Sequence, residues 1–234
     1  MFYISIFINW RIQVSKSLGA SPNKMDLKKK RGRPLNSLSY AEMHRLILDA
    51  AIECFASGGY IGTSNKDIAK CAGVTSGLLY HYFDSKAALF RAALKEVNYR
   101  LLRVYREAAS ANHDTSVLEQ LTLGSKAVLQ LTKEFPSMML FAGHADAEIQ
   151  RNPELALTED IGQDEFKKFF GELLTLAKKR GELDSKIKID TGVRVLIGFM
   201  SKLAAIGSAG KSGVKELSEN LDVFESMLRG KFLK

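Results

Sequence analysis

The amino-acid sequence predicts an all-α fold. Beyond residue 38, apolar residues recur every three or four positions with few breaks, and no segment shows the sustained alternation of a strand. Only 4 prolines interrupt the 234 residues, so most helices can continue without a break. The chain is 46% apolar, which suffices for a sizeable core without disulfide bonds. We expect three parts: a disordered basic arm over residues 1–37, a small helical unit over 38–95 and a larger helical bundle over 96–234.

The first helix is expected over residues 40–57. Its apolar residues, among them Met43, Ile47 and Phe55, recur at helical spacing and therefore share one face. The pair Gly58-Gly59 follows directly and predicts the end of the helix, because glycine readily leaves the helical conformation.

Two short helices are expected next. Ser64 can cap the first of them while Asp67, three residues later, reaches back to it, which is the pattern of a capping box. This helix should end near Gly73. Thr75 can cap the second, which should continue to about Phe83.

A long fourth helix should start after Asp84 or Ser85, either of which can cap it, and reach about Ser110. The remaining helices are predicted from apolar periodicity, caps and proline breaks. They cover about 116–134, 136–151, 166–181, 190–208 and 214–228.

The segment of residues 63–90 says most about function. Two short helices joined by a tight turn at Gly73 make a helix-turn-helix. The outward positions of its second helix carry small or hydrogen-bonding residues and no Glu or Lys, which a merely solvated helix usually has. Such a surface suits a helix that lies in the major groove of DNA.

This segment, within residues 47–94, resembles the DNA-binding domain of the TetR (tetracycline-repressor-like) family. The matching positions are Phe55, Gly58-Gly59-Tyr60, Thr63, Asp67-Ile68-Ala69, Ala72-Gly73-Val74, Ser76-Gly77, Leu79-Tyr80, Phe83 and Ser85-Lys86. The resemblance implies an N-terminal three-helix helix-turn-helix domain for DNA binding and a C-terminal helical bundle for dimerisation and ligand binding. It also implies a sequence-specific transcriptional regulator, a ligand-inducible repressor that binds a palindromic operator as a homodimer.

The resemblance assigns the recognition helix its DNA contacts. Thr75, Ser76 and Gly77 would lie at its start, against phosphates and base edges. Tyr80 would contact a phosphate, and His81 would read or flank the groove.

Four further positions follow from the same resemblance. Ser64 and Asn65 would contact the DNA backbone at the start of the first short helix, and Lys86 would pair with a phosphate. Leu78 stands where the family often has a small polar residue. It could pack on a thymine methyl group or turn inward.

The net charge of +8 lies almost entirely in the N-terminal arm. Residues 1–34 hold eight basic residues and one acidic residue, whereas residues 101–234 hold equal numbers of each. The run Lys28-Lys29-Lys30-Arg31-Gly32-Arg33-Pro34 contains a core that resembles the AT-hook. The arginines could enter a narrow minor groove, or the whole run could attract phosphates diffusely. The rival function is an architectural protein of low specificity, bound to double-stranded DNA mainly through this arm.

In the bundle, the resemblance implies dimerisation through the last two helices, over 190–208 and 214–228, and a pocket for a small-molecule effector that is not identified. Several residues could line such a pocket, although each could instead belong to a filled core. They are Met138, Phe141, His144, Phe166, Phe170 and Met200.

Other classes of function find no support in the sequence. With only 2 cysteines and 4 histidines at no ligand-like spacing, we expect neither a disulfide framework nor a metal site. No set of residues suggests catalysis, so we expect no enzyme and no cofactor. Cys54 and Cys71 are expected as buried, reduced thiols, which fits a cytoplasmic protein. No apolar stretch is long enough to span a membrane.

Overall fold

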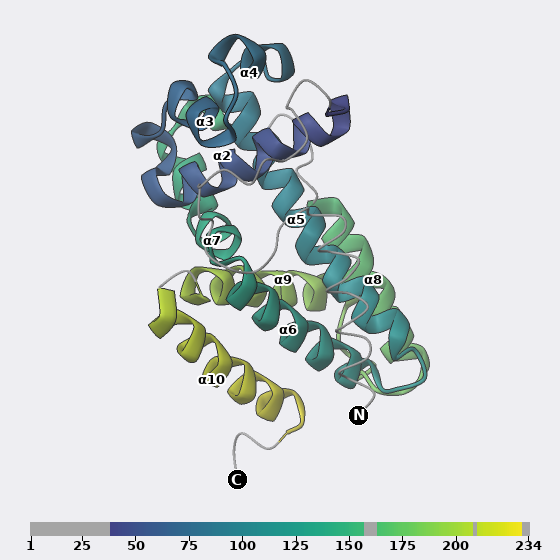
Figure 1. Cartoon of the computed structure of the whole chain (residues 1–234). Helices are drawn as coiled ribbons and strands as arrows, with labels where there is room; N and C mark the ends of the chain where they lie inside the picture. Colours follow the sequence, from purple (N-terminus) through teal and green to yellow (C-terminus); the bar gives the residue numbers. More distant parts are fainter. Residues whose placement is uncertain (1–37, 157–162, 208–209, 231–234) are drawn as a thin grey trace. The chain divides into compact units, whose positions relative to one another are not determined.

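The computed structural model describes residues 38–156, 163–207 and 210–230, and every regular element in these ranges is a helix (Figure 1). The predicted all-α fold class is confirmed. The helices are α2 (Tyr40–Gly62), α3 (Asn65–Ala72), α4 (Ser76–Tyr82), α5 (Lys86–Ala111), α6 (Val117–Glu134), α7 (Pro136–Arg151), η2 (Pro153–Leu155, a 3₁₀ turn), α8 (Gln163–Lys179), α9 (Ile189–Gly207) and α10 (Gly210–Leu228).

Helix α2 is interrupted where the sequence predicts its end. Gly59 has φ 67° and ψ −179°, a conformation that side chains with a Cβ atom rarely adopt. A Cβ atom at Gly59 would also lie 2.8 Å from Oε1 of Glu148 in α7. The last residues assigned to α2 therefore form a separate turn that leads into α3.

Helices α2 to α5 share one apolar core. Ile47 and Phe55 of α2, Ile68 of α3, Leu79 of α4 and Phe90 of α5 are all buried. Helix α2 packs against both α3 and α5, and α3 packs against α4. In Figure 1 the short helices α3 and α4 lie at the opposite side of the fold from α10.

Residues 39–234 form one compact unit in which α5 and α7 join the first helices to the rest. The domain boundary expected at residue 95 falls inside α5, which is continuous. Phe141 of α7 stacks on Phe55, with ring centroids 5.9 Å apart, and meets Phe90 edge-on at 4.9 Å. An aromatic cluster thus connects α2, α5 and α7.

A buried cation also ties α2 to α5. The guanidinium of Arg100 donates hydrogen bonds to Asp49 of α2 at 2.7 Å and to Glu96 of α5 at 2.6 Å. These two carboxylates raise the pKa of Arg100 against the opposing effect of burial, so its charge is retained.

The core of the remaining helices is built from α5, α6, α8 and α9. Tyr105, Leu121, Phe170 and Val193 are among its buried residues. Helix α10 packs on α6 and α9, where Leu203, Leu217 and Leu221 make a smaller cluster. Between α5 and α6 the backbones approach closely at Gly124, since a Cβ atom there would lie 2.3 Å from the Tyr105 ring.

Candidate DNA-binding surface and effector cavity

The helix-turn-helix is held by the local signals that predicted it. Ser64 and Asp67 form the expected capping box: the Asp67 amide donates to Ser64 Oγ at 3.2 Å, and the Ser64 amide donates to Asp67 Oδ2 at 3.1 Å. Gly73 ends α3 with φ 70°. Thr75 Oγ1 then accepts the Leu78 amide at 3.2 Å and caps α4. Capping groups therefore define both ends of α3 and the start of α4.

The predicted recognition helix α4 exposes most of the residues expected to meet DNA. Thr75, Gly77, Tyr80 and His81 are exposed, and Tyr80 keeps 52% of its surface accessible. Ser76 and Leu78 are half-buried. Because Leu78 is neither fully outward nor in the core, both readings of its role stay open.

The start of α3 is more constrained than the sequence suggests. The Ser64 hydroxyl donates to Asp67 at 2.5 Å, so its hydrogen is already used within the protein. Asn65 is half-buried, and within the described residues its Oδ1 atom is buried without a hydrogen-bond partner. The backbone contacts predicted for these two residues stay predictions.

Lys86 has partners inside the protein. Its ammonium donates to the carbonyl oxygens of Tyr60 at 2.8 Å and Thr63 at 3.0 Å, and it lies 4.2 Å from the centre of the Tyr60 ring. It thereby satisfies carbonyl groups after the break in α2. The hydroxyl that caps α5 belongs to Ser85, which accepts the Ala88 amide at 3.1 Å. The phosphate contact predicted for Lys86 would add to this structural role.

An aromatic group beside α4 was not anticipated from the sequence. Tyr40, at the start of α2, stacks on Tyr82 with ring centroids 4.6 Å apart, and His44 lies 4.9 Å from Phe83. Tyr40 is exposed. The signal was present as two aromatic residues one turn apart in the first helix, but only the fold brings them to α4. The basic residues Lys28, Lys29, Lys30, Arg31 and Arg33 lie outside the described residues.

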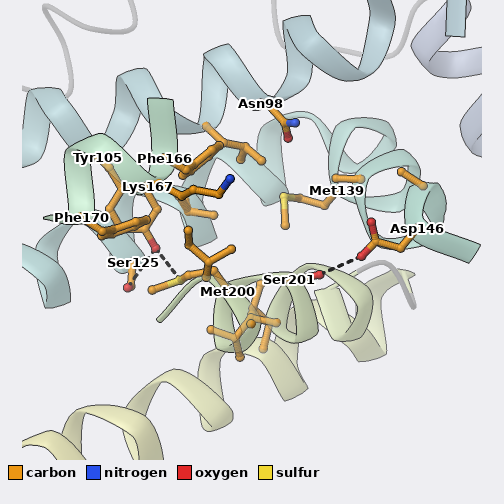
Figure 2. Close-up of a pocket in the computed structure, with 18 of the residues that line it drawn as sticks. Asn98, Tyr105, Ser125, Met139, Asp146, Phe166, Lys167, Phe170, Met200 and Ser201 are labelled. Carbon is orange, nitrogen blue, oxygen red and sulfur yellow. Dashed lines mark hydrogen bonds between the residues drawn. The ribbon is translucent and has the colours of Figure 1, made fainter. Parts of the chain in front are cut away.

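A cavity of about 450 Å³ lies among α5, α6, α7, α8, α9 and α10 (Figure 2). Its walls are mainly apolar. The lining residues are Leu94, Asn98, Leu101, Tyr105, Ser125, Val128, Met139, Ala142, Ala145, Asp146, Phe166, Lys167, Phe170, Arg194, Ile197, Gly198, Met200, Ser201, Leu203, Leu217 and Leu221.

Polar groups occupy two places in the cavity wall. At one, the Tyr105 hydroxyl donates to Met200 Sδ at 2.9 Å and lies 3.2 Å from Ser125 Oγ (Figure 2). At the other, the Ser201 hydroxyl donates to Asp146 at 3.3 Å. Burial raises the pKa of Tyr105 to about 12, so its hydroxyl is neutral.

Comparison with known proteins decides the family. The family model described as "Bacterial regulatory proteins, tetR family" matches residues 47–93, which contain the helix-turn-helix. The HTH-type transcriptional regulator UidR of Escherichia coli K12 is 28% identical over 151 residues, which cover 64% of this chain and 74% of UidR. The helix-turn-helix is that of the TetR family. With this domain, and with its similarity to UidR, the chain is identified as a DNA-binding transcriptional regulator.

The resemblance to TetR-family proteins extends beyond the first helices. The HTH-type transcriptional repressor KstR2 of Rhodococcus jostii RHA1 is also 28% identical over 151 residues, covering 64% of this chain and 72% of KstR2. The structure of the fatty acid degradation regulator FadR from Bacillus halodurans superposes with a TM-score of 0.66 over 80% of this chain and 96% of FadR, at 19% identity. The TetR-family fold therefore includes the bundle.

The cavity of this TetR-family chain contains only three of the six residues predicted to line a pocket. Phe166, Phe170 and Met200 line it. Met138 and Phe141 do not, because they are buried away from the cavity lining, and Phe141 belongs to the aromatic cluster with α2 and α5. His144 is exposed and also lies outside the lining. Helix α7 turns Met139, Ala142 and Asp146 toward the cavity instead.

Sequence reasoning missed the polar residues of the cavity. Tyr105 and Ser125 lie within helices that the apolar periodicity predicts, but the periodicity does not indicate a role for either residue. Asn98, Asp146 and Ser201 are ordinary polar residues in helices. The buried face of α6 also carries Gln120, Thr122 and Thr132, so Ser125 does not stand out in the sequence.

The remaining chemistry of this TetR-family chain is limited. Cys54 and Cys71 are free but half-buried, not fully buried as expected. Burial, together with the neighbouring Cys71 thiol, raises the pKa of Cys54 to about 12, and burial also raises that of Cys71. Within the described ranges, no three His, Cys, Asp or Glu residues are grouped to hold a metal ion. In those same ranges, no helix is sufficiently long and apolar to cross a membrane.

Proposed function

We propose that this TetR-family regulator is a repressor that binds a palindromic operator as a homodimer and is released by a small apolar effector. One observation carries the proposal: a single helix, α5, connects a capped helix-turn-helix to a cavity of about 450 Å³. Lys86 and Tyr105 lie on this helix, about 28 Å apart at 1.5 Å per residue.

Specific DNA binding is supported by the surface of α4. Thr75, Tyr80 and His81 are exposed and offer hydrogen-bonding groups, while Lys and Glu are absent from the helix. Such a surface can read base edges without a strong attraction for any phosphate backbone. The adjoining Tyr40 and Tyr82 stack would lie beside the groove and contact the backbone.

Dimerisation is supported by apolar side chains that α9 and α10 leave exposed. Val195 in α9 is 65% exposed, and Val223 and Met227 in α10 are about half exposed. Phe199 of α9 and Phe224 of α10 stack on each other, with ring centroids 3.8 Å apart. This contact holds the two helices together. A second copy would cover this face and set two α4 helices ~34–36 Å apart, the spacing of successive major grooves.

The response to an effector is supported by the position of the cavity. Its wall includes α5, which carries the helix-turn-helix at its start, and α9, which would lie at the dimer interface. A ligand that shifts α5 relative to α9 would change the separation of the two recognition helices. Coupling of about 1–3 kcal/mol between two sites is common and would suffice for release.

Selection from a random duplex library with the full-length protein tests the proposal. We expect a palindrome whose half-sites are separated by about one helical turn. Footprinting should then show protection on one face of the DNA, and sedimentation should show a dimer. Enrichment of no sequence, or equal competition by random duplex, would refute specific binding.

The rival function, architectural binding through the basic arm, makes a different prediction. Removal of residues 1–34 should lower the affinity and the salt dependence of a specific regulator but leave its site preference intact. For an architectural protein the same deletion should abolish binding. The specific function is favoured because the exposed positions of α4 carry hydrogen-bonding groups and no Lys or Arg.

A further inference from the structure

We propose that the cavity selects an apolar molecule that carries one neutral oxygen, and that this oxygen takes the Tyr105 hydroxyl hydrogen from Met200. The inference rests on the proposed function, since it assigns a ligand class to the effector cavity. It also names the residues that discriminate among ligands.

The hydroxyl is held firmly at the cavity wall. The Tyr105 ring packs edge-on against Phe170, with centroids 5.5 Å apart, and against the backbone of α6 at Gly124. Ser125 Oγ lies 3.2 Å away and donates its own hydrogen to the Leu121 carbonyl at 2.9 Å. The Ser125 hydroxyl therefore has no hydrogen left for Tyr105, and the single Tyr105 hydroxyl hydrogen faces two acceptors, Ser125 Oγ and Met200 Sδ.

The nearer of these two acceptors is a poor one. Tyr105 donates to the thioether sulfur of Met200, which is a weak hydrogen-bond acceptor. A carbonyl or hydroxyl oxygen of a ligand would accept a stronger hydrogen bond from the Tyr105 hydroxyl than the sulfur does. Met200 has several rotatable bonds and can move aside at low cost.

The charges of the cavity wall favour a neutral ligand group at this place. Among the described lining residues, only Lys167, Arg194 and Asp146 are charged, and all three are exposed. Lys167 also pairs with Asp164 at 2.7 Å. In Figure 2 its amine and the Asp146 carboxylate lie apart from the Tyr105 hydroxyl. A carboxylate bound at Tyr105 would lose its hydration without gaining a counter-charge, which is costly.

Three probes that share one carbon skeleton test the ligand class: decane, decan-2-one and decanoate. Binding to the full-length protein is measured by calorimetry for the wild type, Tyr105→Phe, Met200→Leu and Lys167→Gln. We expect the wild type to bind decan-2-one roughly tenfold more tightly than decane, a ratio typical of one buried hydrogen bond. Tyr105→Phe should remove this preference and leave the affinity for decane unchanged.

Two further variants distinguish the effect of the Tyr105 hydroxyl on ligand affinity from the effects of Met200 and Lys167. Met200→Leu removes the competing sulfur at similar volume and should keep or increase the preference for the ketone. Lys167→Gln should leave the preference for decan-2-one over decane unchanged. The inference is overturned if Tyr105→Phe keeps the preference, or if none of the probes binds. It is also overturned if decanoate binds most tightly and depends on Lys167, because the ligand class is then anionic.

The DNA readout keeps this inference distinct from the proposed function. Tyr105→Phe lies far from α4 and should bind the selected operator as the wild type does. If operator binding holds while the ketone preference is absent, only the ligand class is wrong. If no operator can be selected, the proposed function itself fails, whatever the probes do.

Discussion

The ammonium of Lys86 and the carbonyl oxygen of Tyr60 lie 2.8 Å apart, so the first residue of α5 donates a hydrogen bond to the backbone that follows the break in α2. A second bond, to the Thr63 carbonyl, and the Tyr60 ring beneath the ammonium complete its environment. Lys86 therefore holds the entry to the helix-turn-helix in place.

Substitution Lys86→Met should lower the unfolding free energy by about 1–2 kcal/mol, because two hydrogen bonds from a charged donor are lost. Operator affinity should fall as well. Urea denaturation and gel shifts measure the two effects. Lys70→Met, at an exposed position in α3, is the control and should leave stability unchanged. A loss of DNA affinity with no loss of stability would instead assign Lys86 to phosphate alone.

Substitution Gly124→Ala should destabilise the fold by about 1–3 kcal/mol, since the new methyl group would overlap the Tyr105 ring. Gly198→Ala in α9 is the matched control, because no atom lies within 4 Å of its added Cβ. That control should gain stability slightly through helix propensity. Thermal unfolding measures the stability of both variants. Equal stability of Gly124→Ala and Gly198→Ala would contradict the close approach of α5 and α6.

Substitution Asp67→Ala should have an effect that depends on pH. Hydrogen bonds from Ser64 lower the pKa of Asp67 below its ordinary value of 3.8. A carboxyl with a lowered pKa stabilises the fold above its unfolded-state pKa, and this stabilisation is lost as the pH falls through the folded-state pKa. The stability difference between wild type and variant should therefore be constant near neutrality and shrink below about pH 3.8. A difference that is constant at all pH values would exclude the carboxylate as the cause.

Substitution Arg100→Met should cost roughly 2–4 kcal/mol of stability, because it leaves the carboxylates of Asp49 and Glu96 without their cation in a mostly buried site. Both carboxylates are partly exposed, which keeps the cost below that of a fully buried pair. Arg103→Met, which removes a more exposed pair with Glu107, should cost less than 1 kcal/mol. Urea denaturation compares the two variants.

Substitution Val195→Glu should convert the proposed dimer into monomers and reduce operator affinity, because it places a charge on the apolar face of α9. Sedimentation and gel shifts measure these effects, and circular dichroism should remain unchanged. Ile61→Glu is the control, as Ile61 is also exposed but lies in α2. A dimer that survives Val195→Glu would place the interface elsewhere.

The local signals of the sequence predicted the helix-turn-helix closely. Ser64, Gly73 and Thr75 act through hydrogen bonds within a few residues, so their roles can be inferred without knowledge of the fold. The cavity was harder to predict. Met138 and Met139 are both buried, yet only Met139 lines the cavity, because the helices that face each side of α7 come from distant parts of the chain. Apolar periodicity identifies a buried face but not its neighbour.

The two faces of α7 have a consequence for how such a regulator can evolve. Phe141 packs on the aromatic cluster beneath the helix-turn-helix, whereas Met139 and Ala142 face the ligand space. Substitutions at Met139 and Ala142 can therefore change which molecules fit without repacking the contact with α2. Under the proposed function, the fit of a ligand and the packing beneath the helix-turn-helix can therefore change independently, at neighbouring positions of one helix.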